Sequence, residues 1–476
     1  MENKPFTFLQ AVDKYATRSF TKEIDNRSKF VRDRDRILFS KEFRRLQGKT
    51  QVFVNGYDDH IRNRLTHTLE VSQISQTLSD NLGFERRLTE AIALGHDVGH
   101  TPFGHVGERI LNHLTNNCDS FKDFKITEIS EQGFKHNWQG IKVVSSLEKI
   151  HPDYPGLNLT DFTLWGILNH SNLKYKPCKK IVEENCQYRQ NGQKCHVENQ
   201  EFSLGYYTKY EKYLNKSSWT FEGLIVNQAD EIAQRHHDIE DGIIAGIIDK
   251  EEMVNIFLDL FDKYLLDEQK ITLSNIKQAN KMSYAVHDLS TLILSFYSTN
   301  LINHSTEQIK EFINTQNIKN EEDFYKFKSE SDFNPKKLIS FDDEFNKIDK
   351  EFQKYLISRI LNSHLAQTMD GKATHILRII IEAYLTNPKQ LPDNTIISLL
   401  KNFLSENEYQ ALVINKKDSL IAGIMREKVD ELHNANDEKF KCQLIRTITD
   451  FISGMTDKFA ISQYRMLYGS DNYWMK

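Results

Sequence analysis

The chain contains 476 residues, of which 39% are hydrophobic and 27% are charged, and its net charge is -5 at pH 7. This composition is ordinary for a folded protein with a sizeable core, whereas 8 prolines and 20 glycines are too few for a collagen-like, disordered or turn-rich all-β chain. No run approaches the roughly 18 apolar residues of a membrane-spanning helix, and the first twenty residues lack the features of a secretory signal. Five scattered cysteines are typical of reduced thiols, so we expect a cytoplasmic protein without membrane contact.

Apolar residues recur at steps of three and four along most of the chain, and this periodicity predicts an all-α protein. The first clear amphipathic helix covers residues 65–82 and ends at Gly83, a residue type that favours the turn after a helix. The next helix has Leu88, Ile92 and His96 on one face. Further helices are expected at about 106–114, 141–147, 221–248, 357–361, 376–384 and 444–467.

Two polar segments, residues 174–216 and 303–350, are interpreted as surface insertions rather than separate domains. The first holds three cysteines separated by seven and eight residues, which is a poor spacing for zinc, so reduced surface thiols are expected. It is also rich in lysine, which indicates either a solvated loop or contact with a polyanion such as a triphosphate or single-stranded DNA. The residues concerned are Cys178, Cys186, Cys195 and His196, with Lys174, Lys176, Lys179, Lys180, Arg189 and Lys194.

The most informative stretch is LGHDVGHTPFGHVGE at residues 94–108, which holds three histidines, an aspartate and a glutamate. Its adjacent His96 and Asp97 can converge on one cation, while His67 upstream and Asp230 downstream lie on other predicted helices. Two imidazoles and two carboxylates suit Mg, Mn, Fe, Co or Ni better than a structural zinc, and they leave positions for water and a phosphate oxygen. The sequence therefore predicts one divalent metal ion held by these four residues.

A plainer interpretation of this stretch has to be weighed against the metal site. A buried histidine or aspartate is more often a satisfied core residue than a ligand, and a His-Asp pair alone recurs by chance. However, His96, His100 and His105 cannot share one helix face, and the four glycines between them and around them disfavour a helix. The concentration of these residue types favours a functional site.

Several ordered motifs resemble those of the HD-domain phosphohydrolases, and within them the bacterial deoxyguanosine triphosphate triphosphohydrolase family. They are RDRDRILFSKEFRRLQGKTQVF at 32–53, NRLTHTLEV at 63–71, the 94–108 stretch, GFKHNWQ at 133–139, GLNLT at 156–160, and GMTD followed by FA at 454–460. The resemblance spans about residues 20–470. It implies an HD-type helical fold and the hydrolysis of dGTP or other dNTPs to a deoxynucleoside and inorganic tripolyphosphate.

The same resemblance implies roles for single residues. It assigns metal binding to His67, His96, Asp97 and Asp230, in agreement with the analysis above. His105 and Glu108 lie one helical turn apart and match a pair that positions or deprotonates the nucleophile. His100 matches a histidine that contacts phosphate, with a helix cap as the alternative. The residues matched to the nucleotide are Arg64, Gln47 and Asp238, the last two near the sugar 3′-hydroxyl.

One position departs from the family pattern. Relatives carry a tyrosine four residues after the last metal aspartate, as a contact to triphosphate and sugar, and this chain has Gln234 there. The shorter side chain predicts altered sugar or base selectivity with the metal step unchanged. A tyrosine from the first insertion, Tyr206 or Tyr207, is the alternative way to fill the gap. Residues 230, 234 and 238 form one stripe of a helix, which indicates a cleft rather than a solvated face.

These observations predict an all-α enzyme with an HD-domain helical fold and a helical C-terminal region. We expect a helical arm at 1–60, a catalytic core at 61–250, and a region at 251–476 that completes the site and the contacts of a homo-oligomer, since relatives form hexamers. The alternatives are an HD phosphohydrolase acting on a ribonucleoside triphosphate or a signalling nucleotide, and a non-catalytic regulator that binds nucleotide or DNA.

Overall fold

The structure is a computed structural model that describes residues 5–20, 26–51, 62–118, 121, 124–175, 202–279, 282–414 and 418–469. Regular structure in these ranges is helical, without a strand, so the prediction of an all-α fold is confirmed. No helix within them has an apolar stretch of the length that a bilayer crossing requires. The α-helices are α1 Lys29–Leu38, α2 Lys41–Arg45, α3 Arg64–Leu82, α4 Arg86–Gly95, α5 His105–Thr115, α6 His136–Lys142, α7 Asp161–Asn169, α8 Phe221–Ile244, α9 Lys250–Phe261, α10 Asp267–Gln278, α11 Met282–Gln316, α12 Glu321–Glu330, α13 Asp343–Leu361, α14 His364–Thr386, α15 Asp393–Phe403, α16 Glu406–Val413, α17 Asp418–Asn434, α18 Glu438–Ser453 and α19 Asp457–Tyr468.

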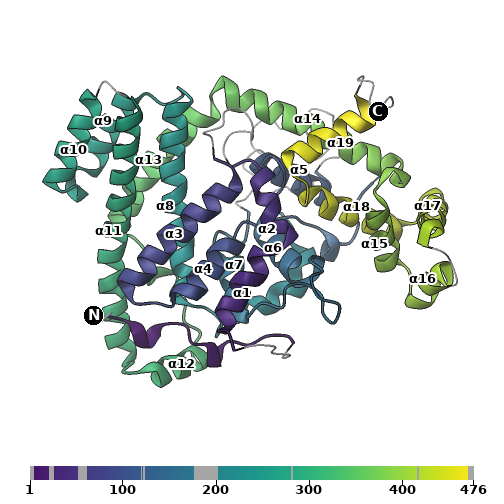
Figure 1. Cartoon of the computed structure of the whole chain (residues 1–476), viewed down its shortest axis with the longest axis horizontal. Coiled ribbons are helices and arrows are strands. Elements are labelled where there is room, and N and C mark those ends of the chain that lie inside the picture. Colours follow the sequence, from purple (N-terminus) through teal and green to yellow (C-terminus); the bar gives the residue numbers. More distant parts are fainter. Residues whose placement is uncertain are drawn as a thin grey trace.

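Helix α4 occupies the centre of the molecule and packs against α1, α3, α7 and α8 (Figure 1). Helix α3 begins at a capping box, in which the Asn63 side chain accepts from the Thr66 amide and Thr66 reciprocates. It ends as the sequence predicts, because Gly83 adopts a φ of 85°, which favours glycine. Both ends of α3 are therefore set by local sequence, and this fixes the position of the residues on its first turn.

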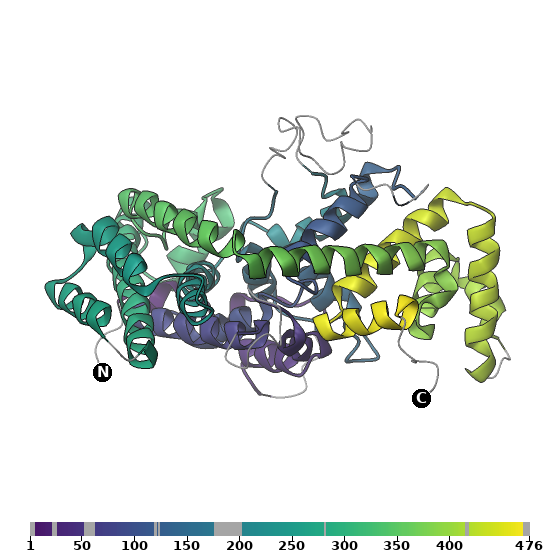
Figure 2. The same ribbon diagram turned by 90° about the horizontal axis from the view of Figure 1, so that it is seen from above.

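Two groups of helices flank this centre. Helices α9, α10, α11 and α13 lie on one side and share a hydrophobic cluster with α3, α4 and α8. Helices α5, α14, α15, α18 and α19 contribute to a second cluster on the other side. Figure 2 shows α14 running between the two flanks, and α14 packs against α13 at one end and against α5 and α19 along its length. The central helices are thus enclosed from both directions.

The second insertion is not a mere surface excursion, because one face of it is part of the helical core, so that prediction is wrong. The 303–350 segment forms the end of α11, all of α12 and the start of α13, and it buries Phe312, Phe324 and Phe345 in the first hydrophobic cluster. The alternating charges of this segment occupy the outer faces of amphipathic helices. In the first insertion, residues 202–216 are also packed, since Tyr207 and Tyr210 are buried against α6 and α7. The three cysteines, His196 and the basic residues from Lys176 onwards lie outside the described residues.

The glycines of the 94–108 stretch have a packing role that periodicity could not show. A Cβ atom on Gly99 would lie 2.1 Å from the His136 carbonyl oxygen and 2.2 Å from the Gly140 amide nitrogen. Gly104 precedes α5 with a φ of 56° and a ψ of -128°, a backbone conformation in which a residue with a side chain would be strained. These glycines let the loop after α4 touch α6 and then turn into α5.

Candidate metal and nucleotide site

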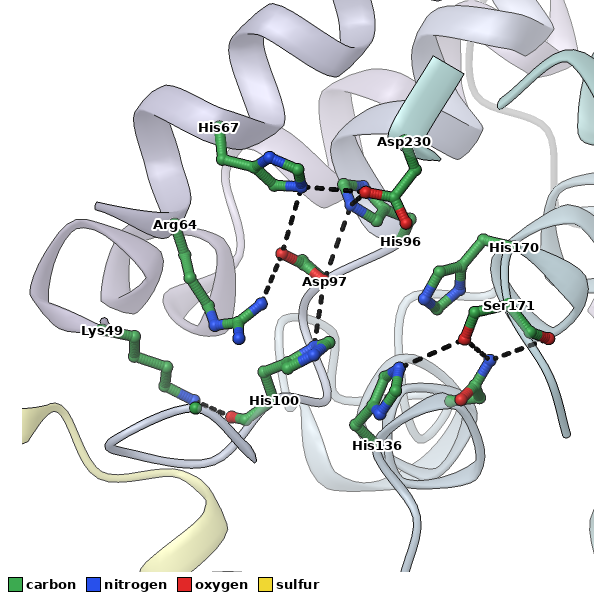
Figure 3. Close-up of polar contacts among 12 residues, drawn as sticks. Lys49, Arg64, His67, His96, Asp97, His100, His136, His170, Ser171 and Asp230 are labelled. Carbon is green, nitrogen blue, oxygen red and sulfur yellow. Dashed lines mark hydrogen bonds and ion pairs between the residues drawn. The ribbon is translucent and has the colours of Figure 1, made fainter. Parts of the chain in front are cut away.

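Four side chains converge where α3, the C-terminal end of α4 and α8 meet, as the sequence predicts (Figure 3): His67 lies on α3, His96 and Asp97 directly follow α4, and Asp230 lies on α8. The His67 Nε2 atom lies 3.0 Å from Asp230 Oδ1 and 3.9 Å from Asp97 Oδ2. The His96 Nε2 atom lies 3.5 Å from Asp97 Oδ1 and 3.8 Å from Asp230 Oδ1. His67, His96 and Asp230 present ligand atoms that all lie within 4.8 Å of one another, so they could hold a metal ion.

The His96 ring is oriented for ligation. Its Nδ1 atom lies 2.6 Å from the Ala93 carbonyl oxygen, so this nitrogen carries the proton and donates. The Nε2 atom is then an acceptor, and it is buried without a hydrogen-bond partner among the described residues. A buried acceptor beside two carboxylates is unfavourable unless a cation lies between them. The donor set therefore fits a divalent metal ion.

A chain of polar contacts orients the imidazole of His67. His67 Nδ1 lies 3.2 Å from His237 Nδ1, and His237 Nε2 is hydrogen-bonded to the Glu70 carboxylate. Arg62 binds the same carboxylate through Nε at 3.0 Å and also pairs with Glu240. Because the His67 Nδ1 atom faces His237, its Nε2 atom is left to face Asp230. Such outer hydrogen bonds orient the ligands of metal sites.

Asp97 is buried and stays ionised. Burial alone would raise its pKa, but the neighbouring His100 and His96 rings and the Arg64 guanidinium outweigh burial and hold the pKa well below its usual range. Arg64 Nη1 donates to Asp97 Oδ2 at 2.8 Å, and His100 Nδ1 lies 2.9 Å from Asp97 Oδ1. Arg64, expected at the nucleotide, is thus held by a predicted metal ligand.

Glu108 is paired with His136 rather than with His105. The His136 Nδ1 atom and backbone amide both contact Glu108 Oε2, and the Tyr175 hydroxyl donates to Oε1 at 3.0 Å. Burial raises the pKa of Glu108, but His136 and Lys135 outweigh it and keep this carboxyl ionised. The His100 and His136 rings lie 3.9 Å apart, so Glu108 reaches the centre through His136. The hydrogen-bonded His105–Glu108 pair expected from the spacing does not form among the described residues.

His105 starts α5, and its side chain is exposed to solvent. Desolvation has the largest effect on its pKa and lowers it, Glu108 raises it, and Arg64 and His136 lower it further. The imidazole is therefore neutral near pH 7 and able to accept a proton. It stands at the edge of the charged residues that surround Asp97.

The residues matched to the nucleotide lie in different environments. Asp238 is buried on α8, and burial raises its pKa to about 7, so its carboxyl can donate or accept at neutral pH. Gln234 is half-buried one turn before it, and Gln47 is exposed in a short 3₁₀ helix. The Tyr207 hydroxyl donates to Gln139 and the Tyr206 hydroxyl contacts Lys142. These two tyrosines therefore bind elsewhere and do not replace the absent tyrosine at 234.

Three residues near the centre were not singled out from the sequence. His136 lies in the GFKHNWQ motif, which indicated a family block without assigning a role to the histidine. The His170 ring lies 5.2 Å from His96 and 5.4 Å from His136, and burial lowers its pKa to about 3, so it is neutral. Lys49 is fully buried and donates to the His100 and Ser453 carbonyl oxygens. The sequence signal that could have pointed to Lys49 is its place in the RLQGKTQ segment of the N-terminal motif.

Comparison with known proteins agrees with this geometry. The HD domain family matches residues 64–242, which contain all four predicted metal ligands, and the phosphohydrolase-associated domain matches residues 397–466. Proteins named deoxyguanosinetriphosphate triphosphohydrolase-like protein are similar to this chain along most of its length. The one from Rickettsia felis is 31% identical over 441 residues, covering 93% of this chain and 92% of the relative. Those from Rickettsia rickettsii and Geobacter sulfurreducens are 30% and 29% identical, covering 93% of this chain and 91% and 89% of the relatives.

The His and Asp donors gathered where α3, α4 and α8 meet, the match of the HD domain to the segment that supplies them, and relatives over nearly the whole length lead to one family. The chain belongs to the HD-domain phosphohydrolases, among the deoxyguanosinetriphosphate triphosphohydrolase-like proteins.

Proposed function

We propose that this protein is a metal-dependent hydrolase that converts a deoxynucleoside triphosphate, dGTP or another dNTP, into a deoxynucleoside and inorganic tripolyphosphate. The observation that carries the proposal is the buried His96 Nε2 atom, which has no hydrogen-bond partner among the described residues and faces Asp97 and Asp230. The names of the relatives support the substrate class.

His67, His96, Asp97 and Asp230 would hold the ion. A divalent ion there, such as Mg, Mn, Co, Fe or Ni, supplies a Lewis acid that polarises a phosphoryl oxygen and neutralises charge. Arg64, held 2.8 Å from Asp97, keeps a positive charge beside the same place and favours an anionic substrate. His100 is buried and its pKa is well below normal, through burial and then Arg64, so it would contact phosphate as a neutral hydrogen-bonding group.

His105 would act as the proton acceptor. It is neutral near pH 7, open to solvent, and close enough to Arg64 and His136 for both residues to lower its pKa. Glu108 would act on the reaction through His136, which it holds. This division of roles differs from the direct pair expected from the sequence.

Asp238 and Gln234 would set the fit of the sugar, since both lie on α8 beyond Asp230. A protonated Asp238 can donate to a hydroxyl and an ionised one can accept. Gln234 offers both an amide donor and a carbonyl acceptor, so we expect weaker discrimination against an extra hydroxyl than with tyrosine at this position. Gln47 stays a prediction as a contact near the 3′-hydroxyl.

The decisive experiment is to incubate the protein with each deoxy- and ribonucleoside triphosphate and several divalent metals, and to identify the phosphate product. Tripolyphosphate from a deoxynucleotide supports the proposal. Pyrophosphate or monophosphate would instead indicate another hydrolase of the family, and turnover of ribonucleotides or a signalling nucleotide would replace the substrate class. Absence of turnover with metal bound would favour a nucleotide- or DNA-binding regulator.

The same assay tests residue 234 through Gln234→Tyr. An unchanged ranking of substrates in this variant would remove Gln234 from the selectivity proposal. Assembly into a homo-oligomer, contact with single-stranded DNA and cytoplasmic location also stay predictions.

A further inference from the structure

A cavity of about 540 Å³ lies apart from the metal donors, none of which lines it. Its walls come from the N-terminal segment, the start of α7, residues 215–217 before α8, and α12. Its volume is in the range of small-molecule sites, roughly 300–1,000 Å³. The stacked rings of Tyr15 and Tyr325, with centroids 3.6 Å apart, contribute to the walls.

Lys328 lies at this cavity with an unusual environment for an ammonium group. Its side chain is part of the cavity lining, yet only 2% of the residue is exposed. The Nζ atom lies over the rings of Phe162 at 4.7 Å, Tyr325 at 5.0 Å and Trp219 at 5.1 Å. Within the described ranges, no carboxylate oxygen lies within the 4.0 Å of an ion pair. Among the described residues, Lys328 is thus a buried amine without a carboxylate partner.

This arrangement is costly unless something else contacts the ammonium. Aromatic faces stabilise a desolvated ammonium by about 2 kcal/mol, less than the several kcal/mol that its dehydration costs. Burial accordingly lowers the pKa of Lys328 to about 7, with Glu222 and Asp161 acting in the opposite direction from a distance. A methionine or leucine would fill the same aromatic pocket without that cost. An anion entering the cavity would supply the missing partner.

The other charges of the cavity limit which anion fits. Two acidic residues, Asp161 and Glu322, balance Lys326 and Lys328. Asp161 is already engaged, because its Oδ1 accepts from the Thr17 amide at 2.7 Å and its Oδ2 from the Ser218 hydroxyl at 3.1 Å. These four charges sum to zero, so a bound monoanion leaves a net charge of -1 at the cavity and a dianion leaves -2 beside two carboxylates, which favours the monoanion.

We propose that this cavity binds a small organic carboxylate, whose anionic group pairs with the Lys328 ammonium while its body lies against the aromatic walls. The side chains of Thr17, Asn215 and Ser217 line the same space and offer further hydrogen bonds. The site lies outside the catalytic machinery, so binding does not require the metal. The proposal therefore stands or falls independently of the hydrolase activity.

Benzoate, its neutral analogue benzamide, and inorganic phosphate are suitable probes. Their binding to the full chain in the presence of a chelator can be measured by ligand-detected NMR in the wild type, Lys328→Met and Lys326→Met. We expect benzoate to bind the wild type and Lys326→Met with a dissociation constant on the order of 1 mM, and to bind Lys328→Met at least about tenfold more weakly. Equal binding of benzamide or of phosphate would overturn the carboxylate assignment, and equal benzoate binding by Lys328→Met would overturn the site.

A second measurement decides the matter if Lys328→Met does not fold. Acetic anhydride labels neutral lysine amines, and mass spectrometry can report the rate at each residue of the wild type. At about ten times a millimolar dissociation constant, benzoate should slow the labelling of Lys328 by roughly tenfold. The exposed Lys347 on α13 is the internal control and should not change. Labelling of Lys328 that benzoate does not slow would show a structural cation held by rings alone.

Discussion

Asp97 serves two neighbours at once, and this separates it from Asp230. Asp97 binds the buried Arg64 and also faces His100, whereas Asp230 contacts His67 and has a partly exposed side chain. Both carboxylates belong to the proposed metal site. Of the two, only Asp97 neutralises a buried guanidinium, that of Arg64.

The first prediction compares Asp97→Ala with Asp230→Ala. Both variants should lose bound metal and activity. Asp97→Ala should in addition lose about 3 kcal/mol of stability, because removal of one partner leaves the charge of Arg64 buried and unpaired. Asp230→Ala should lose much less, since it also relieves repulsion between two carboxylates. Metal analysis and urea unfolding in a chelator test this, and equal losses of stability would contradict it.

The second prediction concerns His105→Ala. Turnover should fall by roughly 10²- to 10⁴-fold, the usual contribution of a general base, while metal content stays near normal. His136→Ala should also lower turnover, and it should destabilise the fold, because Glu108 would lose its buried partner. Metal analysis beside the rate assay separates the roles. Loss of metal from His105→Ala would make that residue a ligand or a structural element.

At the scale of single elements, the loop between α4 and α5 depends on a close contact with α6. Gly99 touches the His136 carbonyl and the Gly140 amide with no room for a side chain. Gly371 lies within α14, and a Cβ atom added there would have no heavy atom within 4 Å of it. The two glycines therefore differ in what an added methyl group would meet.

The third prediction uses this difference. Gly99→Ala should displace α6 from the loop, and we expect a loss of stability of about 3 kcal/mol and a large loss of activity. Gly371→Ala should raise stability by about 1 kcal/mol, the helix preference of alanine over glycine, with activity unchanged. Thermal and urea unfolding of both variants provide the check. A stable and active Gly99→Ala protein would show that the loop does not need this contact.

Helix α8 is tied to two other segments at its first turn by Glu222. Its Oε1 atom accepts from the Ala11 amide at 2.9 Å and from the Glu85 amide at 2.8 Å. Full burial raises the pKa of Glu222 to about 7, so the carboxyl is protonated in the fold below that pH. The protonated Glu222 carboxyl makes its full contribution to the free energy of unfolding below about pH 4.3, the pKa of a glutamate in the unfolded chain. This contribution is lost as the pH rises to about 7, the pKa of Glu222 in the fold.

The fourth prediction follows from this loss of stability as the pH rises. Glu222→Gln should have little effect on the free energy of unfolding at pH 5 and should raise it by about 1–3 kcal/mol relative to the wild type at pH 8. The amide cannot ionise, and its oxygen can keep both backbone hydrogen bonds. The exposed Glu351→Gln on α13 is the matched control and should show no such pH dependence. A difference between variant and wild type that is constant from pH 5 to 8 would contradict the argument.

The elements show what periodicity can and cannot reveal. The bounds of α3 were predictable because Asn63 and Gly83 are local signals. The convergence of the four proposed metal donors was predictable because several His and Asp residues are concentrated in and around one glycine-rich stretch. The burial of Phe312, Phe324 and Phe345 was not predictable from charge density, since an amphipathic helix can carry many charges and still bury one face. The His136–Glu108 contact joins residues 28 apart, and it depends on how α5 meets α6. Likewise, the single helix expected at 444–467 is two helices in the structure, α18 and α19, because the chain turns at residues 454–456.

At the scale of the whole molecule, the C-terminal helices hold in place the loop that follows the proposed metal ligands His96 and Asp97. Asp457 at the start of α19 accepts from the Phe103 amide at 2.8 Å and from the Thr50 hydroxyl. Lys49 connects the His100 carbonyl to Ser453 at the end of α18. Residues near 50, 100 and 455 therefore form one structural unit, although all four proposed ligands lie before residue 231.

The fifth prediction tests that unit with Asp457→Ala. Activity should fall roughly 10- to 100-fold, because the loop holding His100 and His105 would lose its anchor and small displacements of catalytic groups are costly. Metal content should stay near normal, and stability should fall by about 1–3 kcal/mol. Lys458→Ala changes the exposed neighbour and should have no effect. Normal activity in Asp457→Ala would show that the loop is held well enough without α19.

The contact between Asp457 and the loop also has a consequence in time. The last proposed ligand is residue 230 and the anchor is residue 457, so 457 - 230 = 227 residues are synthesised between them. At roughly 5–20 residues per second, this corresponds to about 10–45 seconds of translation. During that interval the nascent chain carries all four proposed metal donors, but the loop after Asp97 lacks its contact with Asp457. A nascent chain of this protein is therefore expected to be able to acquire metal well before it can turn over substrate.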